Sequence, residues 1–225
     1  MTSLHAPAPQ PSYRLIPSRF PPIPLFETVA GADDLPAVME LAGWTNDRLT
    51  PERLARLPSE DRVHGRPNAS VVLAAFLHVS PIGSRFNGPD LGAWYAAADL
   101  RTAIAEVGHH LRREAVASRR RELRRTYRAY SARLAGDYLD IRGETTTRPG
   151  LYAPDSYVAS QVFGEAARKA GEDGILFASV RLSGGENVVA YRPRNVLDVV
   201  QADHFEIVVR STGRLIDARR LRVEA

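Results

Sequence analysis

Three residues whose types could cleave a nucleotide lie within one short part of the chain, residues 83–110. Arg85 stands in a loop rich in glycine and proline, Tyr95 follows in a short strand-like segment, and Glu106 lies in the helix-like segment after it. Arginine forks match phosphate oxygens, an aromatic ring can stack on a base or sugar, and a carboxylate can stabilise a developing positive charge. Together the three types predict a site that binds and cleaves a nucleotide.

Each of these residues also has an ordinary structural interpretation. Glu106 lies about 120° from the centre of its helix's apolar stripe, at about 100° per residue, so it fits either an exposed position or the edge of a cleft. Arg85 could be a surface residue of a turn, and Tyr95 a core residue. His109 and His110 point about 100° apart and cannot both join Glu106 on one ion, so we predict no metal site.

The elements that must position these residues are short strands and helices. Asp99 predicts a helix start, and apolar residues recur every three or four positions through about Ala117. Residues 70–80 form a continuous apolar run that fits a buried strand or a short core helix. Further strands are expected at 13–17, 93–97, 138–142, 175–182, 188–191, 205–210 and 215–223, and further helices at 35–42, from Thr50 and Pro51 onward, and at 157–170. This order predicts an α+β fold, with helices flanking a mixed, largely antiparallel sheet.

The composition narrows the class of protein. The chain has 225 residues and no cysteine, which excludes disulfides and thiolate metal sites. No apolar run reaches the roughly 20 residues of a membrane span, and the N-terminal residues lack the pattern of a signal peptide. We therefore expect a cytoplasmic protein without membrane contact, with a flexible tail over residues 1–12.

The formal net charge is +4, and Lys169 is the only lysine among 30 basic residues. The arginines gather between residues 112 and 133, where Glu114 and Glu122 interrupt them. Such a run fits nucleic acid, an acidic protein partner, or a solvated and mobile segment. We expect an acidic partner rather than direct nucleic-acid binding.

An ordered set of five motifs resembles the RES domain family, which is named for Arg, Glu and Ser. One motif is a continuous segment, the family's GGR(W/F)N loop, tyrosine-bearing strand and A-x-x-E helix, and it is similar to residues 83–87, 94–96 and 103–106. Four further motifs of the family also have matches. They are an aromatic–Arg pair at Tyr13–Arg14, a serine-containing helix start at 156–161, a serine-containing strand at 174–181, and an asparagine turn followed by proline at 187–193. Ser84 departs from the pattern, since it replaces the loop's second glycine. A serine does not readily take a positive φ, so the departure puts the loop's geometry in question.

The resemblance implies roles for individual residues in binding NAD+, which is a substrate here rather than a cofactor. Glu106 would hold the ribose and stabilise its developing positive charge. Arg14 and Arg85 would bind the diphosphate, and Tyr95 would stack on the nicotinamide or the ribose. A serine would hold the ribose or the amide; both Ser160 and Ser179 qualify, and Ser160 is preferred because it opens an amphipathic helix.

The resemblance also implies a fold and a biological role. RES domains resemble ADP-ribosyltransferases and are toxins of bacterial toxin–antitoxin pairs that attack NAD+. We therefore expect one RES-like domain over residues 13–225, with residues 17–70 as a variable N-terminal extension packed on it. The expected activity is hydrolysis or phosphorolysis of NAD+, and the expected partner is an antitoxin with a helix-turn-helix domain. The alternatives are ADP-ribosylation of a protein target and a binding module without catalysis.

Overall fold

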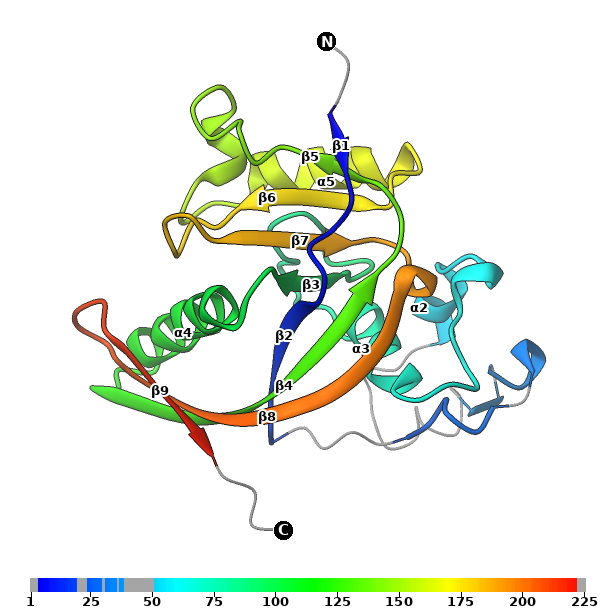
Figure 1. Ribbon diagram of the computed structural model, residues 1–225, viewed down its shortest axis with the longest axis horizontal. Helices are drawn as coiled ribbons and strands as arrows, with labels where there is room; N and C mark the ends of the chain where they lie inside the picture. Colours follow the sequence, from blue (N-terminus) through cyan, green and yellow to red (C-terminus); the bar gives the residue numbers. More distant parts are fainter. Residues whose placement is uncertain (1–3, 20–23, 30, 36, 39–50, 222–225) are drawn as a thin grey trace.

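The computed structural model describes residues 4–19, 24–29, 31–35, 37–38 and 51–221. Within these residues one sheet runs in the order β1-β5-β6-β7-β3-β2-β4-β8-β9, and only β5 and β6 pair in parallel. The strands are β1 (His5–Ala6), β2 (Ser12–Pro17), β3 (Trp94–Ala97), β4 (Glu122–Leu134), β5 (Tyr138–Asp140), β6 (Gly174–Ala178), β7 (Glu186–Ala190), β8 (Val196–Arg210) and β9 (Ile216–Leu221). The α+β class with a mixed, largely antiparallel sheet is confirmed (Figure 1).

The helices of the described residues cover both faces of this sheet. They are α2 (Pro51–Ala55), α3 (Ala69–Leu77), α4 (Leu100–Ala117) and α5 (Val158–Lys169), with short 3-10 helices η1 (Ala32–Asp34), η2 (Ser59–Asp61), η3 (Pro149–Tyr152) and η4 (Pro193–Asn195). None of the helices described combines the length and the hydropathy that a bilayer crossing requires.

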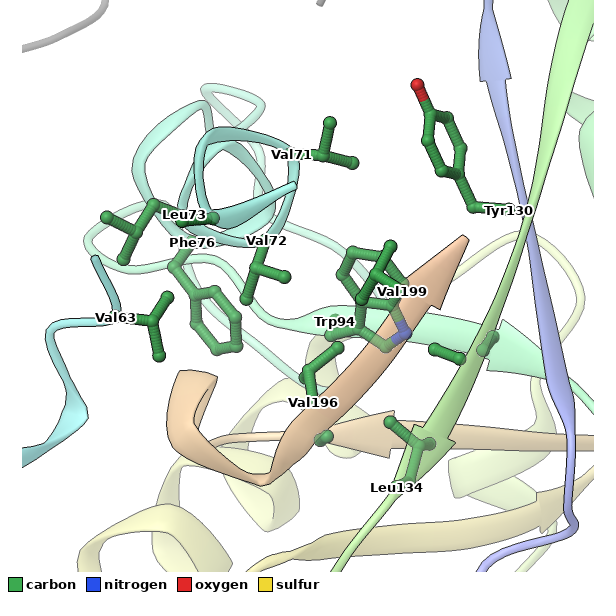
Figure 2. Packing of buried hydrophobic residues seen from close by; sticks show 14 of the residues in the cluster. Val63, Val71, Val72, Leu73, Phe76, Trp94, Tyr130, Leu134, Val196 and Val199 are labelled. Atoms are coloured by element: carbon green, nitrogen blue, oxygen red, sulfur yellow. The ribbon is translucent and has the colours of Figure 1, made fainter. Parts of the chain in front are cut away.

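Strand β3 shows how the two faces are divided. Side chains alternate along a strand, so Trp94 faces one side and Tyr95 the other. Trp94 is fully buried in a core that includes Val72 and Phe76 of α3 (Figure 2). Tyr95 packs against the cluster beneath α5, whereas Ala97 joins the cluster beneath α4. Helices α4 and α5 therefore lie on the same face of the sheet, opposite α3.

Helix α4 begins and ends where the sequence predicts. The Oδ1 atom of Asp99 accepts a hydrogen bond of 2.8 Å from the backbone N–H of Thr102, which caps the helix. Its apolar side, including Leu111, packs on β2, β4 and β8 in the core. The cap and the apolar stripe together fix the rotation of α4 and hence the direction of Glu106.

Some expectations about the elements need correction or completion. The apolar run at 70–80 is the helix α3, since α3 covers Ala69–Leu77. Strand β6 ends at Ala178, so Ser179 follows the strand instead of lying in it. The expected flexible tail is wrong for part of its length, because His5 and Ala6 pair with β5 as β1. The expected helix over 35–42 and the cap at Thr50 fall largely or wholly outside the described residues.

The arginine-rich segment between residues 112 and 133 is ordered structure. It forms the last turns of α4 and most of β4. Arg125 makes two hydrogen bonds with Glu114, of 2.6 and 2.8 Å. Arg112 donates to the backbone carbonyls of Arg210 and Leu215. Part of this positive charge is therefore used within the fold, and the alternative interpretation of the run as a mobile segment does not hold.

Candidate active site

A pocket of about 680 Å³ opens on the face of the sheet that carries α4 and α5. One wall is a stripe of α4 whose residues recur every three or four positions. The stripe consists of Ala103, Glu106, Val107, His110, Arg113, Glu114 and Ala117. At 1.5 Å per residue it runs for about 21 Å, which is long enough for a dinucleotide. Further lining residues come from the loop at residues 80–85, from Tyr157 and from Phe177.

Glu106 is one of two carboxylates on this stripe and lies near its N-terminal end. Its Oε1 atom accepts two hydrogen bonds of 2.7 Å, one from the Ser179 hydroxyl and one from the Asn187 amide. Both hydrogen bonds that the described residues make to Glu106 end on Oε1. The other oxygen, Oε2, is thus left for a ligand in the pocket. Asn187 is only 4% exposed, so the donor that fixes Glu106 is itself held by packing.

The two candidate serines differ sharply in position. The Ser179 hydroxyl donates to Glu106 and accepts from the backbone N–H groups of Arg181 and Leu182, both at 3.1 Å. The Ser160 side chain is fully buried in α5, and its hydroxyl donates to the carbonyl of Tyr157 at 3.2 Å. The geometry therefore favours Ser179 over Ser160, contrary to the sequence-based preference. The donor and the acceptor sites of the Ser179 hydroxyl are all engaged by groups of the protein. The hydroxyl therefore serves to orient Glu106.

The loop that carries Arg85 is built around Gly83. Its φ of +69° is one that side-chain-bearing residues rarely adopt, and an added Cβ would collide with the Asn87 carbonyl. Ser84 is not among the described non-glycine residues with positive φ, so the departure from the family's glycine leaves the loop intact. The Gln161 side chain connects this loop to α5, because it donates hydrogen bonds to the carbonyls of Ile82 and Ser84.

Arg85 is a buried arginine at 8% exposure, and it lines the pocket. Its Nη1 donates to the carbonyls of Leu151 and Ala153, and its guanidinium lies 4.9 Å from the ring centre of Tyr157. Burial is the main cause that lowers the pKa of Arg85. Arg85 therefore brings a positive charge to the pocket. Its Nη1 group is already engaged, since it binds the backbone of η3 and of the segment after it.

Tyr95 lines the pocket but is tied to the arginine loop. Its hydroxyl donates to Asn87 at 2.9 Å and accepts from the backbone N–H of Phe86 at 2.8 Å. Burial raises the pKa of Tyr95 well above its ordinary value, so the hydroxyl stays protonated and keeps donating. The half-buried ring thus contributes to the pocket lining, whereas the hydroxyl bonds to the loop.

Arg14 lies where β2 and β3 separate, since these strands pair only at Tyr13 and Ala97. Its Nη1 donates to the carbonyl of Tyr95 at 2.9 Å, and its guanidinium lies 5.0 Å from the ring centre of Trp94. Burial lowers the pKa of Arg14 to about 10. Arg14 contributes to the pocket lining from this position.

The pocket contains residues that the sequence reasoning did not assign to it. The family resemblance gives Asn187 no role, and the sequence indicates only a helix start at Tyr157. His110 and Arg113 also line the wall, at spacings from Glu106 that a helical wheel places on one side. Desolvation lowers the pKa of His110, with Glu106 opposing the shift. Over the described part of the chain, no three His, Cys, Asp or Glu residues are grouped so as to hold a metal ion.

Comparison with known proteins identifies the family. The RES domain family matches residues 53–210, which is more than half of the chain, and the chain belongs to this family. The matched range includes Arg85, Tyr95, Glu106 and Ser179, whereas Arg14 precedes it.

Two individual proteins show similarity to the chain. It is 35% identical over 133 residues to the uncharacterised protein y4oC of Sinorhizobium fredii, a match that covers 58% of this chain and 56% of y4oC. The chain thus matches little more than half the length of this curated relative. Among solved structures, the MbcT–MbcA toxin–antitoxin complex of M. tuberculosis is similar at a TM-score of 0.42 and 19% identity, covering 54% of this chain and 73% of that one.

Proposed function

We propose that this protein cleaves the bond between nicotinamide and ribose in NAD+. The observation that carries the proposal is the carboxylate of Glu106, held through Oε1 by Ser179 and Asn187 on the wall of a pocket large enough for a dinucleotide. The RES family membership supports the substrate class. Aromatic rings of Tyr95, Tyr157 and Phe177 line the same pocket and offer surfaces for the nicotinamide.

The chemistry requires a group that stabilises positive charge on the sugar. As the bond from ribose C1′ to the nicotinamide nitrogen breaks, its electron pair neutralises the pyridinium and leaves an oxocarbenium-like sugar. Oε2 of Glu106 would hold a ribose hydroxyl and stabilise that charge from a fixed position. Water or phosphate then forms the new bond at C1′ and gives up a proton. A carboxylate already oriented by two donors needs little rearrangement during this step.

The decisive experiment is incubation of the purified chain with NAD+ while released nicotinamide is measured. Glu106→Gln keeps the size of the side chain and removes its charge, so it should lower the rate by at least about a hundredfold. Glu122→Gln is the matched control, since Glu122 is an exposed carboxylate on β4 outside the pocket lining. Loss of NAD+ at equal rates with the wild type and Glu106→Gln would refute the assignment. Product analysis with and without phosphate would distinguish hydrolysis from phosphorolysis.

A protein acceptor is the second candidate for the reaction. Transfer of ADP-ribose to a side chain would use the same donor site, because the acceptor enters only after the bond to nicotinamide breaks. Labelled NAD+ added to a cell extract would show ADP-ribosylated protein bands that depend on Glu106. A chain that neither consumes NAD+ nor labels protein would instead be a binding module.

The biological role that we propose is a cytoplasmic toxin restrained by an antitoxin with a helix-turn-helix domain. Expression of the wild type should lower cellular NAD+ and stop growth, whereas Glu106→Gln should do neither. Arg119, Arg120 and Arg121 are exposed at the turn between α4 and β4 and would attract an acidic surface of the antitoxin. If charge reversal at these positions left the affinity for the inhibitor and its salt dependence unchanged, this contact would be wrong.

A further inference from the structure

The two arginines expected to bind the substrate's diphosphate are already partly engaged. Arg14 donates to the Tyr95 carbonyl and is desolvated, and Arg85 donates through Nη1 to two backbone carbonyls. A bidentate grip on a phosphate needs two free N–H groups on one edge of a guanidinium. These contacts leave fewer donors for the diphosphate than two free arginines would offer, so other cations of the pocket become relevant.

Arg113 is an exposed arginine on the wall of the same pocket, two turns beyond Glu106 on α4. Arg181 follows Ser179, and its backbone N–H donates to the hydroxyl that orients Glu106. The charges of Arg181 and Arg113 both act on His110, and Arg181 also acts on Arg85. Arg113 thus lines the pocket two turns beyond Glu106, whereas Arg181 lies outside the lining, in the turn after β6 whose Ser179 orients Glu106. Among the described residues, no carboxylate lies within ion-pair distance of either guanidinium.

The balance of charge at this end of the pocket is positive. Glu114 also lines it, but both of its oxygens accept hydrogen bonds from Arg125, at 2.6 and 2.8 Å. The charge of Glu114 is therefore already matched and does not neutralise Arg113. Positively charged side chains that cluster in a pocket repel one another, and a bound anion relieves that repulsion.

We propose that Arg113 and Arg181 form a subsite that binds the diphosphate of a dinucleotide whose ribose lies at Glu106. The inference rests on the proposed function for the identity of the ligand. On α4 the rise from Glu106 to Arg113 is about 10 Å, so a sugar at Glu106 places its phosphates along the helix toward Arg113. Arg181 is partly engaged as well, since its Nη2 donates to the Pro154 carbonyl at 2.6 Å, and Arg113, whose guanidinium makes no hydrogen bond among the described residues, supplies most of the free donors. Arg14 and Arg85 then shape the site around the sugar.

The test is equilibrium binding of ADP-ribose to the purified chain by titration calorimetry, which requires no turnover. Arg113→Ala and Arg181→Ala should each weaken binding by about tenfold or more, since each removes a charge-assisted contact. Each variant should also reduce the dependence of the dissociation constant on salt concentration. Arg101→Ala is the matched control, because Arg101 is exposed on α4, does not line the pocket and is not part of the turn that orients Glu106. Its affinity for ADP-ribose should equal that of the wild type.

Folding of the variants is checked by their urea unfolding midpoints, and Arg113→Lys and Arg181→Lys provide second variants that keep the charge. Partial recovery of affinity with lysine would support a phosphate contact. No binding of ADP-ribose by the wild type, or unchanged affinity in both alanine variants, would overturn the subsite. A chain that cleaves NAD+ with unchanged KM in both variants would contradict the subsite alone. A chain that binds ADP-ribose through these arginines but leaves NAD+ intact would contradict the cleavage alone.

Discussion

The hydroxyl of Ser179 donates a hydrogen bond of 2.7 Å to Oε1 of Glu106, across 73 residues of sequence. The same hydroxyl accepts two backbone N–H groups of the turn that follows β6. The turn, the serine and the carboxylate therefore form one chain of hydrogen bonds. The backbone of the turn fixes the position of the Ser179 hydroxyl, and the hydroxyl fixes the orientation of the Glu106 carboxylate. Ser179 is in this sense a positioning residue.

The first prediction separates the two serines. Ser179→Ala removes a hydrogen bond to a charged group, which contributes about 1.5–3 kcal/mol, and should lower kcat for NAD+ cleavage about ten- to hundredfold. Ser160→Ala removes only a hydrogen bond to a carbonyl within α5 and should leave kcat within a few-fold of the wild type. Nicotinamide release by both variants is the measurement. Equal losses in kcat would show that the orienting role does not belong to Ser179.

The second prediction concerns the backbone of the arginine loop. Gly83→Ala and Gly184→Ala both place an alanine at positive φ, +69° and +76°, which costs about 1–2 kcal/mol. An added Cβ at Gly184 meets nothing within 4 Å, whereas at Gly83 it meets backbone of Asn87 and Gly88. Urea unfolding should therefore show a larger loss of stability for Gly83→Ala than for Gly184→Ala. Similar losses would mean that the loop shifts easily to accept the extra carbon.

The third prediction concerns the hydroxyl of Tyr95. Tyr95→Phe leaves the Phe86 N–H and the Asn87 side chain without this buried partner, which costs about 1–3 kcal/mol. Because the loop also carries Arg85, KM for NAD+ should rise together with the loss of stability. Tyr130→Phe is the control, since the Tyr130 hydroxyl makes a 3.2 Å bond to Gln201 outside the pocket. An unchanged KM in Tyr95→Phe would indicate that the loop does not depend on the hydroxyl.

The sequence predicts much of this architecture because the signals are local. The cap at Asp99 and the apolar periodicity after it define α4 within a residue or two, and the short apolar segment with Trp94 and Tyr95 indicates β3. The motif order then places Glu106, Arg85 and Tyr95 around one pocket. The run at 70–80 fits both a helix and a strand, because a buried helix and a buried strand can each consist of uninterrupted apolar residues.

The remaining parts depend on contacts that sequence spacing does not encode. The preference for Ser160 rested on its place at a helix start, but rotation of α5 buries that side chain completely. Whether Ser179 or Ser160 meets Glu106 depends on where β6 ends and how the following turn folds back. The pairing of His5–Ala6 with β5 is likewise a tertiary contact, made by a segment whose composition is typical of a tail.

The fourth prediction follows from the pKa of His109, which burial and nearby positive charges lower to about 4. In the unfolded chain a histidine titrates near its ordinary value of about 6.5. Between pH 6.5 and pH 4 the unfolded chain therefore binds more protons at this position than the folded chain, and acid favours unfolding. The contribution of His109 to the free energy of unfolding should be constant above pH 6.5 and should fall as the pH drops toward 4.

The comparison that isolates this effect is urea unfolding of the wild type and His109→Gln across pH 4 to 8. Glutamine keeps a polar side chain but binds no proton, so the variant should lose less stability than the wild type between pH 6.5 and 4. Above pH 7 the difference between the two proteins should not change with pH. Parallel curves over the whole range would show that His109 titrates alike in the folded and the unfolded chain, and would contradict its desolvation beside Arg181 and His110.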